Sequence, residues 1–174
     1  ELTGERGNEF EQYIYEFLSD AGVEAWFSCK TSKHNGNEVD VIFLRDEVVY
    51  FVEVKFVLPT LNILTQAGIQ NVNETFDEKI FNQRINDSSK SFPEKIDSWR
   101  SLDADSEILH QPLNSDQREW IDLPEKWLDY DYRRLVVSNF VPSYIEKQGV
   151  RFITDLELYQ WIKKDKGVFY STHQ

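Results

Sequence analysis

The densest hydrophobic stretch of the chain lies at residues 38–56, EVDVIFLRDEVVYFVEVKF, where two apolar runs flank a short polar break. Both runs are rich in Val, Ile, Phe and Tyr, which favour β-strands. We therefore predict a β-hairpin with strands at 38–45 and 48–56 and a turn at Asp46 and Glu47. The turn lacks the Asn-Gly or Asp-Gly pair typical of a tight primed turn, so its type stays open.

A symmetric turn would set the register of this hairpin. It places Asp40 opposite Glu53 and Glu38 opposite Lys55. Because side chains alternate between the faces of a strand, these four charged residues share one face with Ile42, Leu44, Val49 and Phe51. The other face carries Val39, Val41, Phe43, Val52 and Val54, with Tyr50 and Arg45 toward the turn. Two mostly apolar faces are typical of strands covered on both sides.

Charged residues at one end of such a hairpin need a physical reason. Two carboxylates placed directly opposite each other repel, and burying an unpaired charge is costly. A cation bound between Asp40 and Glu53 would remove both costs, and oxygen ligands suit a hard ion such as Mg²⁺. The alternative is that this end lies beyond the core and is simply solvated.

These residues resemble the PD-(D/E)XK nuclease superfamily, especially its Mrr-type restriction endonucleases, Holliday-junction resolvases and RecB-like nucleases. The resemblance is carried by Asp40 and, after twelve further residues, Glu53-Val54-Lys55. The surrounding EVDVI (38–42) and YFVEVK (50–55) are close to the form found in several branches. GERGNE (4–9) is similar to a Gly-x-x-Gly helix start that supplies an extra acidic ligand there. Val39 stands where the family motif has Pro.

The resemblance implies a Mg²⁺- or Mn²⁺-dependent endonuclease that hydrolyses phosphodiester bonds, with DNA as the first candidate substrate. Asp40 and Glu53, joined by the Val54 carbonyl, would hold the metal. Lys55 would orient or deprotonate the attacking water, or stabilise the transition state. Glu38 would steer Lys55 or join the metal shell. Glu9, beside the apolar stripe of the first helix, would be the extra carboxylate, or else an ordinary first-turn Glu favoured by the helix dipole.

The rest of the chain predicts an α/β fold. A first helix is expected at 4–21, a strand at 23–29 and a polar loop at 30–37, followed by the hairpin. A helix is expected at 73–86, strands at 134–140 and 149–154, a short helix or turn at 142–148 and a closing helix at 156–164. We thus expect a restriction-endonuclease-like αβββαβ core with a mixed central sheet.

Five polar residues near the predicted site are candidates for substrate binding: Lys30, Lys33 and His34 in the loop, and Gln83 and Arg84 on the helix. In RecB-like nucleases a Gln on the helix after the Lys contacts the active site, which Gln83 or Gln66 could match. The alternative for the helix residues is a solvated face. A loop histidine more often contacts phosphate or solvent than acts as a base.

Length and composition favour a single nuclease-like domain over residues 1–174. The single cysteine, Cys29, excludes an intrachain disulfide and favours a reducing compartment, and no apolar run of membrane-spanning length occurs. We therefore expect a cytoplasmic protein that does not bind membranes. The net charge of −12 is unusual for a protein that binds a polyanion. Residues 25–37 and 54–73, which flank the hairpin, contain no Asp or Glu.

Much of the acidity falls in residues 87–131, with twelve Asp or Glu and five Lys or Arg. This segment also contains Trp99, Trp120 and Trp127, and we predict that it is a mostly helical insertion. It is either a lid whose tryptophans pack on the core or a functional surface. Such a surface would dock a second copy or another protein, or form a flap over the active site that mimics nucleic acid. Two further functions stay open: a catalytically silent nuclease-fold subunit that assembles through this insertion, and an RNA endonuclease.

Overall fold

The computed structural model describes residues 2–31, 34–58, 65–82 and 91–164. Its α-helices in these ranges are α1 (Leu2–Asp20), α2 (Gln66–Phe76), α3 (Phe92–Trp99) and α4 (Asp155–Lys164). A π-helical turn, η1 (Asp77–Phe81), continues α2, and a 3-10 helix, η2 (Glu125–Asp129), precedes the sixth strand. None of the helices in the described ranges is long and apolar enough to cross a lipid bilayer.

The strands form one mixed, open sheet in the order β5-β4-β1-β2-β3-β6-β8-β7. They are β1 (Ala25–Thr31), β2 (His34–Arg45), β3 (Val48–Lys55), β4 (Glu107–His110), β5 (Glu119–Asp122), β6 (Asp131–Ser138), β7 (Glu146–Lys147) and β8 (Val150–Thr154). β6 pairs in parallel with both β3 and β8, and the other neighbours are antiparallel. The chain therefore has the α/β class that its sequence predicts.

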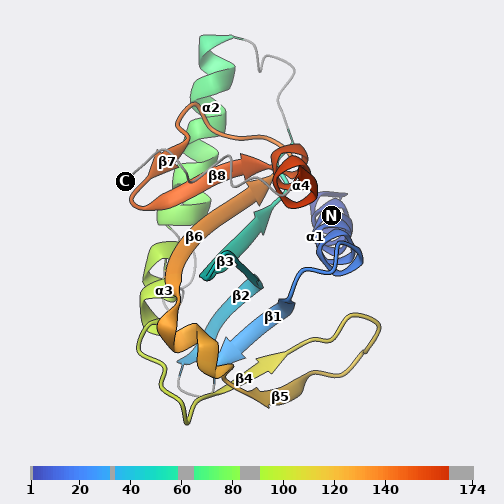
Figure 1. Ribbon diagram of the computed structural model, residues 1–174. Coiled ribbons are helices and arrows are strands. Elements are labelled where there is room, and N and C mark those ends of the chain that lie inside the picture. Colours follow the sequence, from blue (N-terminus) through green and yellow to red (C-terminus); the bar gives the residue numbers. More distant parts are fainter. Residues whose placement is uncertain (1, 32–33, 59–64, 83–90, 165–174) are drawn as a thin grey trace.

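Helices cover the two faces of the sheet (Figure 1). On one face, α1 and α4 contribute Ile14, Leu18, Leu158 and Trp161, which pack with Val41, Phe43, Val52 and Leu135. On the other face, α2, η1 and α3 contribute Val72, Phe76, Ile80, Ile96 and Trp99, which pack with Ile42, Phe51 and Val136. The central strands are therefore buried on both sides, as their uninterrupted apolar runs predict.

The β2–β3 hairpin has the predicted register, since Val41 pairs with Val52 and Leu44 with Val49. Asp46 and Glu47 have φ angles of 51° and 59°, which defines a type I′ turn built without Gly or Asn. Val39 departs from the predicted alternation. It was expected on the face of Val41 and Phe43, but it packs on the opposite face with Ile42. Ser28 on the neighbouring β1 has a φ of 48°, and this left-handed residue disturbs the alternation at the same level.

Residues 87–131 are not mostly helical, which corrects the prediction. Between α3 and η2 the chain forms the β4–β5 hairpin, and β4 pairs with β1 and extends the sheet. Trp99 and Trp127 are buried in the core, whereas Trp120 is 50% exposed. The segment therefore contributes a sheet edge and core side chains, and its part at 87–90 lies outside the described residues.

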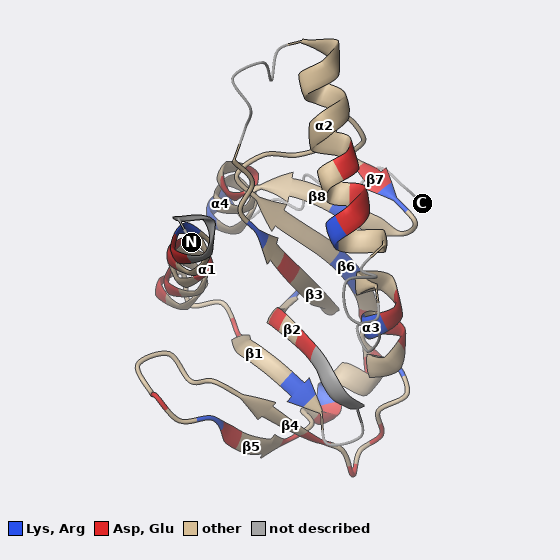
Figure 2. Ribbon diagram, turned by 180° about the vertical axis from the view of Figure 1, so that it is seen from behind, with Lys and Arg blue, Asp and Glu red and all other residues tan. Residues whose placement is uncertain are grey.

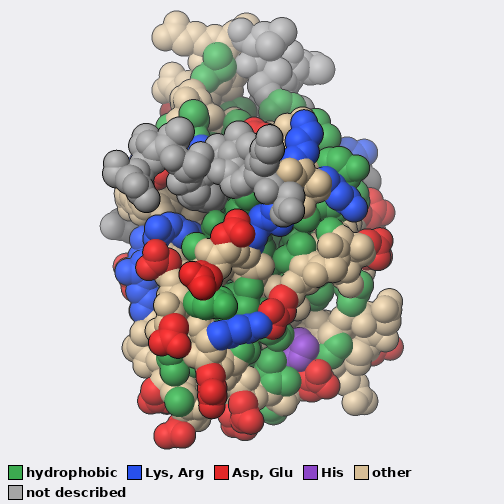
Figure 3. All heavy atoms as spheres, in the orientation of Figure 1, with side chains coloured by type: hydrophobic (Ala, Val, Ile, Leu, Met, Phe, Trp, Pro, Cys, Tyr) green, Lys and Arg blue, Asp and Glu red, His purple; other side chains and the backbone are tan. Residues whose placement is uncertain are grey.

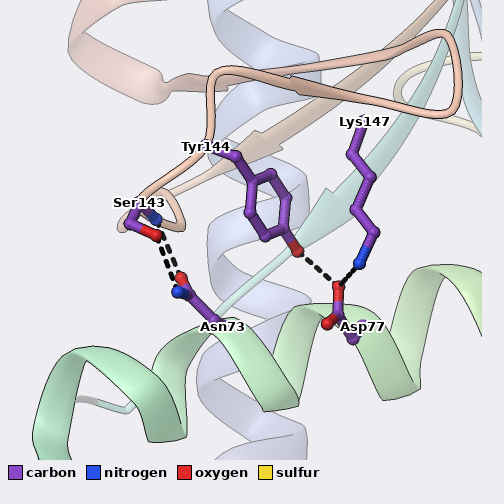
Figure 4. Close-up of polar contacts among 5 residues, drawn as sticks. All are labelled: Asn73, Asp77, Ser143, Tyr144 and Lys147. Carbon is purple, nitrogen blue, oxygen red and sulfur yellow. Dashed lines mark hydrogen bonds and ion pairs between the residues drawn. The ribbon is translucent and has the colours of Figure 1, made fainter.

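One further expectation about local structure was wrong, and a second, a short helix or turn at 142–148, was right only in its turn. His34 to Asn37, predicted as loop, begin the long strand β2. The segment between β6 and β8 contains β7 and turns but no helix, although all of its residues are described. Polar bonds tie this segment to the helix opposite: Asn73 exchanges two hydrogen bonds with Ser143, and Asp77 accepts from Tyr144 and Lys147 (Figure 4). These tertiary contacts override the weak local preference for a helical turn.

Candidate functional site

The candidate site lies where β3 ends. β3 carries two charged residues, Glu53 and Lys55, visible as an acidic and a basic band on this strand (Figure 2). Glu53 is only 5% exposed, and Lys55 Nζ lies 2.7 Å from Glu53 Oε1. β6 pairs with β3 along its whole length on the other side, and Lys55 is aligned with Ser138. The central position of β3 thus forces both charges into a largely buried environment.

Asp40 reaches the same place from β2. The backbone pairing of β2 with β3 ends at Val41 and Val52, one position before Asp40. Beyond that point the Asp40 carboxylate serves as the acceptor for β3 in place of a backbone carbonyl. Its Oδ2 accepts a hydrogen bond of 2.8 Å from the Val54 backbone N–H. In an extended strand the N–H and C=O of one residue point to the same side. The Val54 carbonyl therefore also lies on the side of Asp40.

One buried oxygen at this site lacks a hydrogen-bond partner. Glu53 Oε2 is inaccessible to solvent and no described group donates to it, whereas Oε1 is held by Lys55. Leaving a buried acceptor unsatisfied costs about 1–3 kcal/mol, and more for a charged group. A further donor, an ordered water or a cation beside this oxygen would satisfy it.

Helix α1 supplies a further carboxylate, but it is Glu11 and not Glu9. Glu9 is exposed, whereas Glu11 is partly buried and accepts a hydrogen bond from Tyr15 Oη. Burial raises the pKa of Glu11, the Tyr15 bond lowers it, and the negative charges of Glu53 and Glu38 raise it further. Glu11 therefore belongs to the electrostatic environment of the β3 charges, whereas Glu9 is exposed on the same helix.

The pKa shifts at the centre follow from burial and like charge. Burial raises the pKa of Asp40 well above its usual value, and the neighbouring Glu53 and Glu11 raise it further. For Lys55, burial lowers the pKa, but the ion pair with Glu53 and the charges of Asp40 and Glu11 outweigh burial and leave it raised. Lys55 is therefore a permanent cation at neutral pH, among carboxylates that repel one another.

Glu38, predicted opposite Lys55, is engaged elsewhere. Its Oε2 lies 3.2 Å from Lys30 Nζ and 3.1 Å from Arg118 of the segment that leads into β5. Lys30 is thus held by this ion pair next to the site. Arg118 was not anticipated from the sequence, because nothing in its local pattern indicates that β4 pairs with β1 and brings Arg118 within reach of Glu38.

For four of the residues predicted to bind substrate, the structure describes no side chain. Lys33, Gln83 and Arg84 lie outside the described residues. His34 is the first residue of β2 and pairs through its backbone with Thr31. Gln66, the other candidate for the helix glutamine, begins α2 and is exposed.

The residues at this centre are compatible with a divalent cation held partly by solvent. Within the described ranges, no three His, Cys, Asp or Glu side chains converge closely enough to hold a metal ion by themselves. Two carboxylates, Asp40 and Glu53, and the Val54 carbonyl are what the chain offers, together with the unpartnered Glu53 oxygen. Mg²⁺ characteristically uses one or two carboxylates and keeps several waters, so this sparse set suits it.

Comparison with protein-family models, with curated proteins and with solved structures gave no match for this chain. Any assignment of function therefore depends on the residues and geometry described above.

Glu11 could have been found from the sequence. It lies three residues before Ile14 and seven before Leu18, two positions of the predicted apolar stripe that are now seen to be buried. Residues with these spacings share one helix face. The similarity of residues 4–9 to a family helix start directed attention to Glu9 instead.

Proposed function

We propose that this protein is a metal-dependent nuclease that hydrolyses phosphodiester bonds, with DNA as the first candidate substrate. The observation that carries the proposal is the buried Glu53 carboxylate, which has one oxygen on Lys55, one oxygen without a described donor, and Asp40 on the adjacent strand. A purely structural ion pair would not need a second buried carboxylate beside it, since that residue adds repulsion along with its hydrogen bond from the Val54 N–H.

The order of elements supports a restriction-endonuclease-like core. Helix α1, strands β1 to β3, helix α2 and the parallel strand β6 follow one another as α, β, β, β, α and β, with the β4–β5 hairpin inserted before β6. The acidic residues and the lysine lie on the second and third of these strands, as in the PD-(D/E)XK pattern that the sequence resembles. An α/β sheet alone would not specify the chemistry, so the proposal depends on the side chains.

In the proposed mechanism, Asp40, Glu53 and the Val54 carbonyl hold a Mg²⁺ or Mn²⁺ ion. When bound, such an ion acidifies water and neutralises charge that develops on the phosphate. Lys55, charged because of its raised pKa, is better suited to stabilise the developing negative charge than to remove a proton. Glu11, whose pKa is raised and which accepts a hydrogen bond from Tyr15, is a third carboxylate that can accept a proton from the reacting water.

RNA has the same phosphodiester link, and none of the residues described above distinguishes a ribose from a deoxyribose. RNA endonuclease activity is therefore tested together with DNA cleavage.

The proposal is tested by cleavage assays on labelled linear, single-stranded and branched DNA and on RNA, with Mg²⁺, Mn²⁺ or EDTA. We expect cleavage that requires the metal and that falls by at least about 100-fold in Lys55→Ala, the scale of a lost electrostatic contact to the transition state. Lys126→Ala is the matched control, because Lys126 also pairs with a glutamate, Glu24, but is exposed and far along the chain from the site. It should cleave like the wild type.

Titration calorimetry with Mn²⁺ gives an independent measurement. Wild type should bind the ion, and Glu53→Gln should lose most of that binding because a neutral amide is a poor ligand for a hard cation. If the wild type neither cleaves any substrate nor binds Mn²⁺ or Mg²⁺, the nuclease proposal is wrong.

A further inference from the structure

A cleft of about 550 Å³ opens directly beside the candidate site. Its walls are Gln12 and Tyr15 of α1, Ser28 of β1, and the 111–116 segment that joins β4 to β5. The volume lies within the roughly 300–1,000 Å³ typical of small-ligand sites. Figure 1 shows the β4–β5 connection extending from the sheet edge on the side of α1.

Two residues connect this cleft to the site. Tyr15 donates its hydroxyl hydrogen bond to Glu11, whose pKa is sensitive to Glu53 and Lys55. Ser28 lies between Phe27 and Cys29, which pair with Val41 and Val39, so Ser28 is across from Asp40. A group bound in the cleft would therefore lie next to a phosphate held at Asp40 and Glu53.

The lining chemistry excludes a phosphate pocket. Amide and hydroxyl groups predominate, Leu113 and Pro112 add apolar surface, and the one charged residue of the lining is Asp116. No Lys or Arg of the described chain lines the cleft, so the lining offers no cationic side chain to an anionic phosphate. A neutral, planar group with several donors and acceptors suits this surface, and an unpaired nucleobase has these properties.

The wall formed by residues 111–116 is fixed on both sides. The Gln111 backbone N–H donates to the Phe27 carbonyl at 2.9 Å, and the Gln111 side chain donates to the Ser115 carbonyl. Beyond the segment, Arg118 is anchored to Glu38 at 3.1 Å. The cleft is therefore preformed, which lowers the entropic cost of binding a ligand.

We propose that this cleft binds an unpaired nucleobase next to the scissile phosphate, so that the substrate is single-stranded at that point. The inference rests on the proposed nuclease function and specifies its substrate class. A base stacked inside a duplex is not available to such a cleft, because it would first have to leave its stack. Single strands and the unpaired arms of branched substrates are thus favoured over continuous duplex.

The test measures binding by fluorescence anisotropy with Ca²⁺ in place of Mg²⁺. The probes are labelled single strands of DNA and of RNA with one sequence, the DNA duplex, and a DNA strand with abasic positions. Whichever of the two single strands binds more tightly, the DNA or the RNA, shows which nucleic acid supplies the base. Gln12→Trp fills the cleft from α1 and should weaken single-strand binding about tenfold, the order expected for the loss of one bound base.

A matched control comes from α2. Gln70 is, like Gln12, an exposed helix residue whose side-chain amide donates to a glutamate four positions later, but it does not line the cleft. Gln70→Trp should bind single strands as the wild type does, and duplex binding should be unchanged in both variants. Wild type should bind the abasic strand as weakly as Gln12→Trp binds the ordinary strand.

If Gln12→Trp does not fold by circular dichroism, Asn114→Gly replaces it. Asn114 has a φ of 70°, which glycine adopts without strain, so this variant removes a lining amide and keeps the backbone. The cleft proposal is overturned if single strands bind no better than duplex, or if neither cleft variant differs from Gln70→Trp. Cleft-dependent binding without cleavage in any metal would overturn the nuclease function alone.

Discussion

Glu53 and Glu11 are carboxylates placed where isolated charge is unfavourable. Glu53 is almost fully buried with one unsatisfied oxygen, and burial followed by like charge raises the pKa of Glu11. Natural proteins retain such destabilising arrangements mainly where function needs them. Replacing the Glu11 charge should therefore make the protein more stable, whereas replacing Glu53 would leave Lys55 without its ion-pair partner.

The variant Glu11→Gln tests whether the charge of Glu11 destabilises the folded protein. The amide oxygen can still accept the Tyr15 hydrogen bond, while the repulsion with Glu53 and Glu38 is removed. We expect Tm at pH 7.5 to rise by a few degrees, since about 1 kcal/mol shifts Tm by roughly 2–4 °C in a chain of this size.

Glu9→Gln is its matched control, because Glu9 lies on the same helix but is exposed. Its Tm should equal that of the wild type within error in differential scanning calorimetry. Equal shifts in both variants, or a lower Tm in Glu11→Gln, would mean that Glu11 is not under electrostatic strain.

At the scale of elements, the connection from β6 to β8 contains no helix and is held against α2 and η1 by hydrogen bonds of its side chains. Asp77 at the start of η1 accepts from Tyr144 Oη at 2.8 Å and from Lys147 Nζ at 2.5 Å. Burial raises the pKa of Asp77, but these bonds outweigh it and leave the pKa below its usual value (Figure 4). The ionised carboxylate is therefore the form that anchors the connection.

This pairing predicts a pH-dependent stability. Because the folded pKa of Asp77 is lowered, its contribution is present above the unfolded pKa of about 3.9 and is lost as pH falls through the folded value. Asp77→Asn should be less stable than wild type at pH 7 by up to about 1 kcal/mol, since both partners are about one-third exposed.

Urea unfolding at a series of pH values from neutral to acidic measures this contribution. The gap between wild type and Asp77→Asn should close toward acid, whereas the exposed Asp105→Asn should show no gap. A gap that is constant with pH would mean that the loss comes from packing and not from the charged bonds.

At the scale of the whole molecule, a group of acidic residues lies at the end of β3 that is opposite the site. Asp46 and Glu47 form the turn before β3, and Asp129 and Asp131 lie at the entry to β6, where Asp131 is aligned with Val48. Lys55 is at the other end of β3, about 23 Å away for an extended strand. That separation exceeds two Debye lengths of about 8 Å at physiological salt, so these acids repel a bound phosphate only weakly. Figure 3 shows Asp and Glu crowded toward the lower end of one face.

The tryptophans of residues 87–131 separate the two interpretations of that segment. Trp127 is fully buried against Trp26 and Phe51, with ring centroids 5.0 and 6.4 Å away, whereas Trp120 is half-exposed. Trp127→Ala should cost about 3–5 kcal/mol of unfolding free energy in urea titrations. Trp120→Ala should stay within about 0.5 kcal/mol of wild type.

Of the three tryptophans in this segment, Trp120 is therefore the one whose ring is exposed to a protein partner. If Trp120→Ala were as destabilising as Trp127→Ala, the β4–β5 edge would be packed and not exposed. For the same reason, deleting residues 87–131 would remove core side chains together with any docking surface, so point variants are the better probe.

The features that could be predicted from sequence are those set by local pattern. The hairpin register, the double burial of β3 and the grouping of Asp40, Glu53 and Lys55 follow from period-two alternation and a two-residue turn. The β4–β5 hairpin could not be predicted, because its short strands gain their stability from pairing with β1. The Arg118 contact with Glu38 and the bonds of Asp77 likewise join residues 67 or more positions apart, which local pattern does not encode.

The parallel pairing of β3 with β6 also bears on how the site comes into being. β2 and β3 are joined by two residues and can pair early, whereas β6 follows β3 only after residues 56–130. Asp40 and Glu53 can therefore meet in a short nascent chain, but the strand that buries them arrives much later. We expect the repulsion between them to be relieved by solvent during synthesis and to become costly only when β6 docks, which makes the site one of the last parts of the molecule to mature.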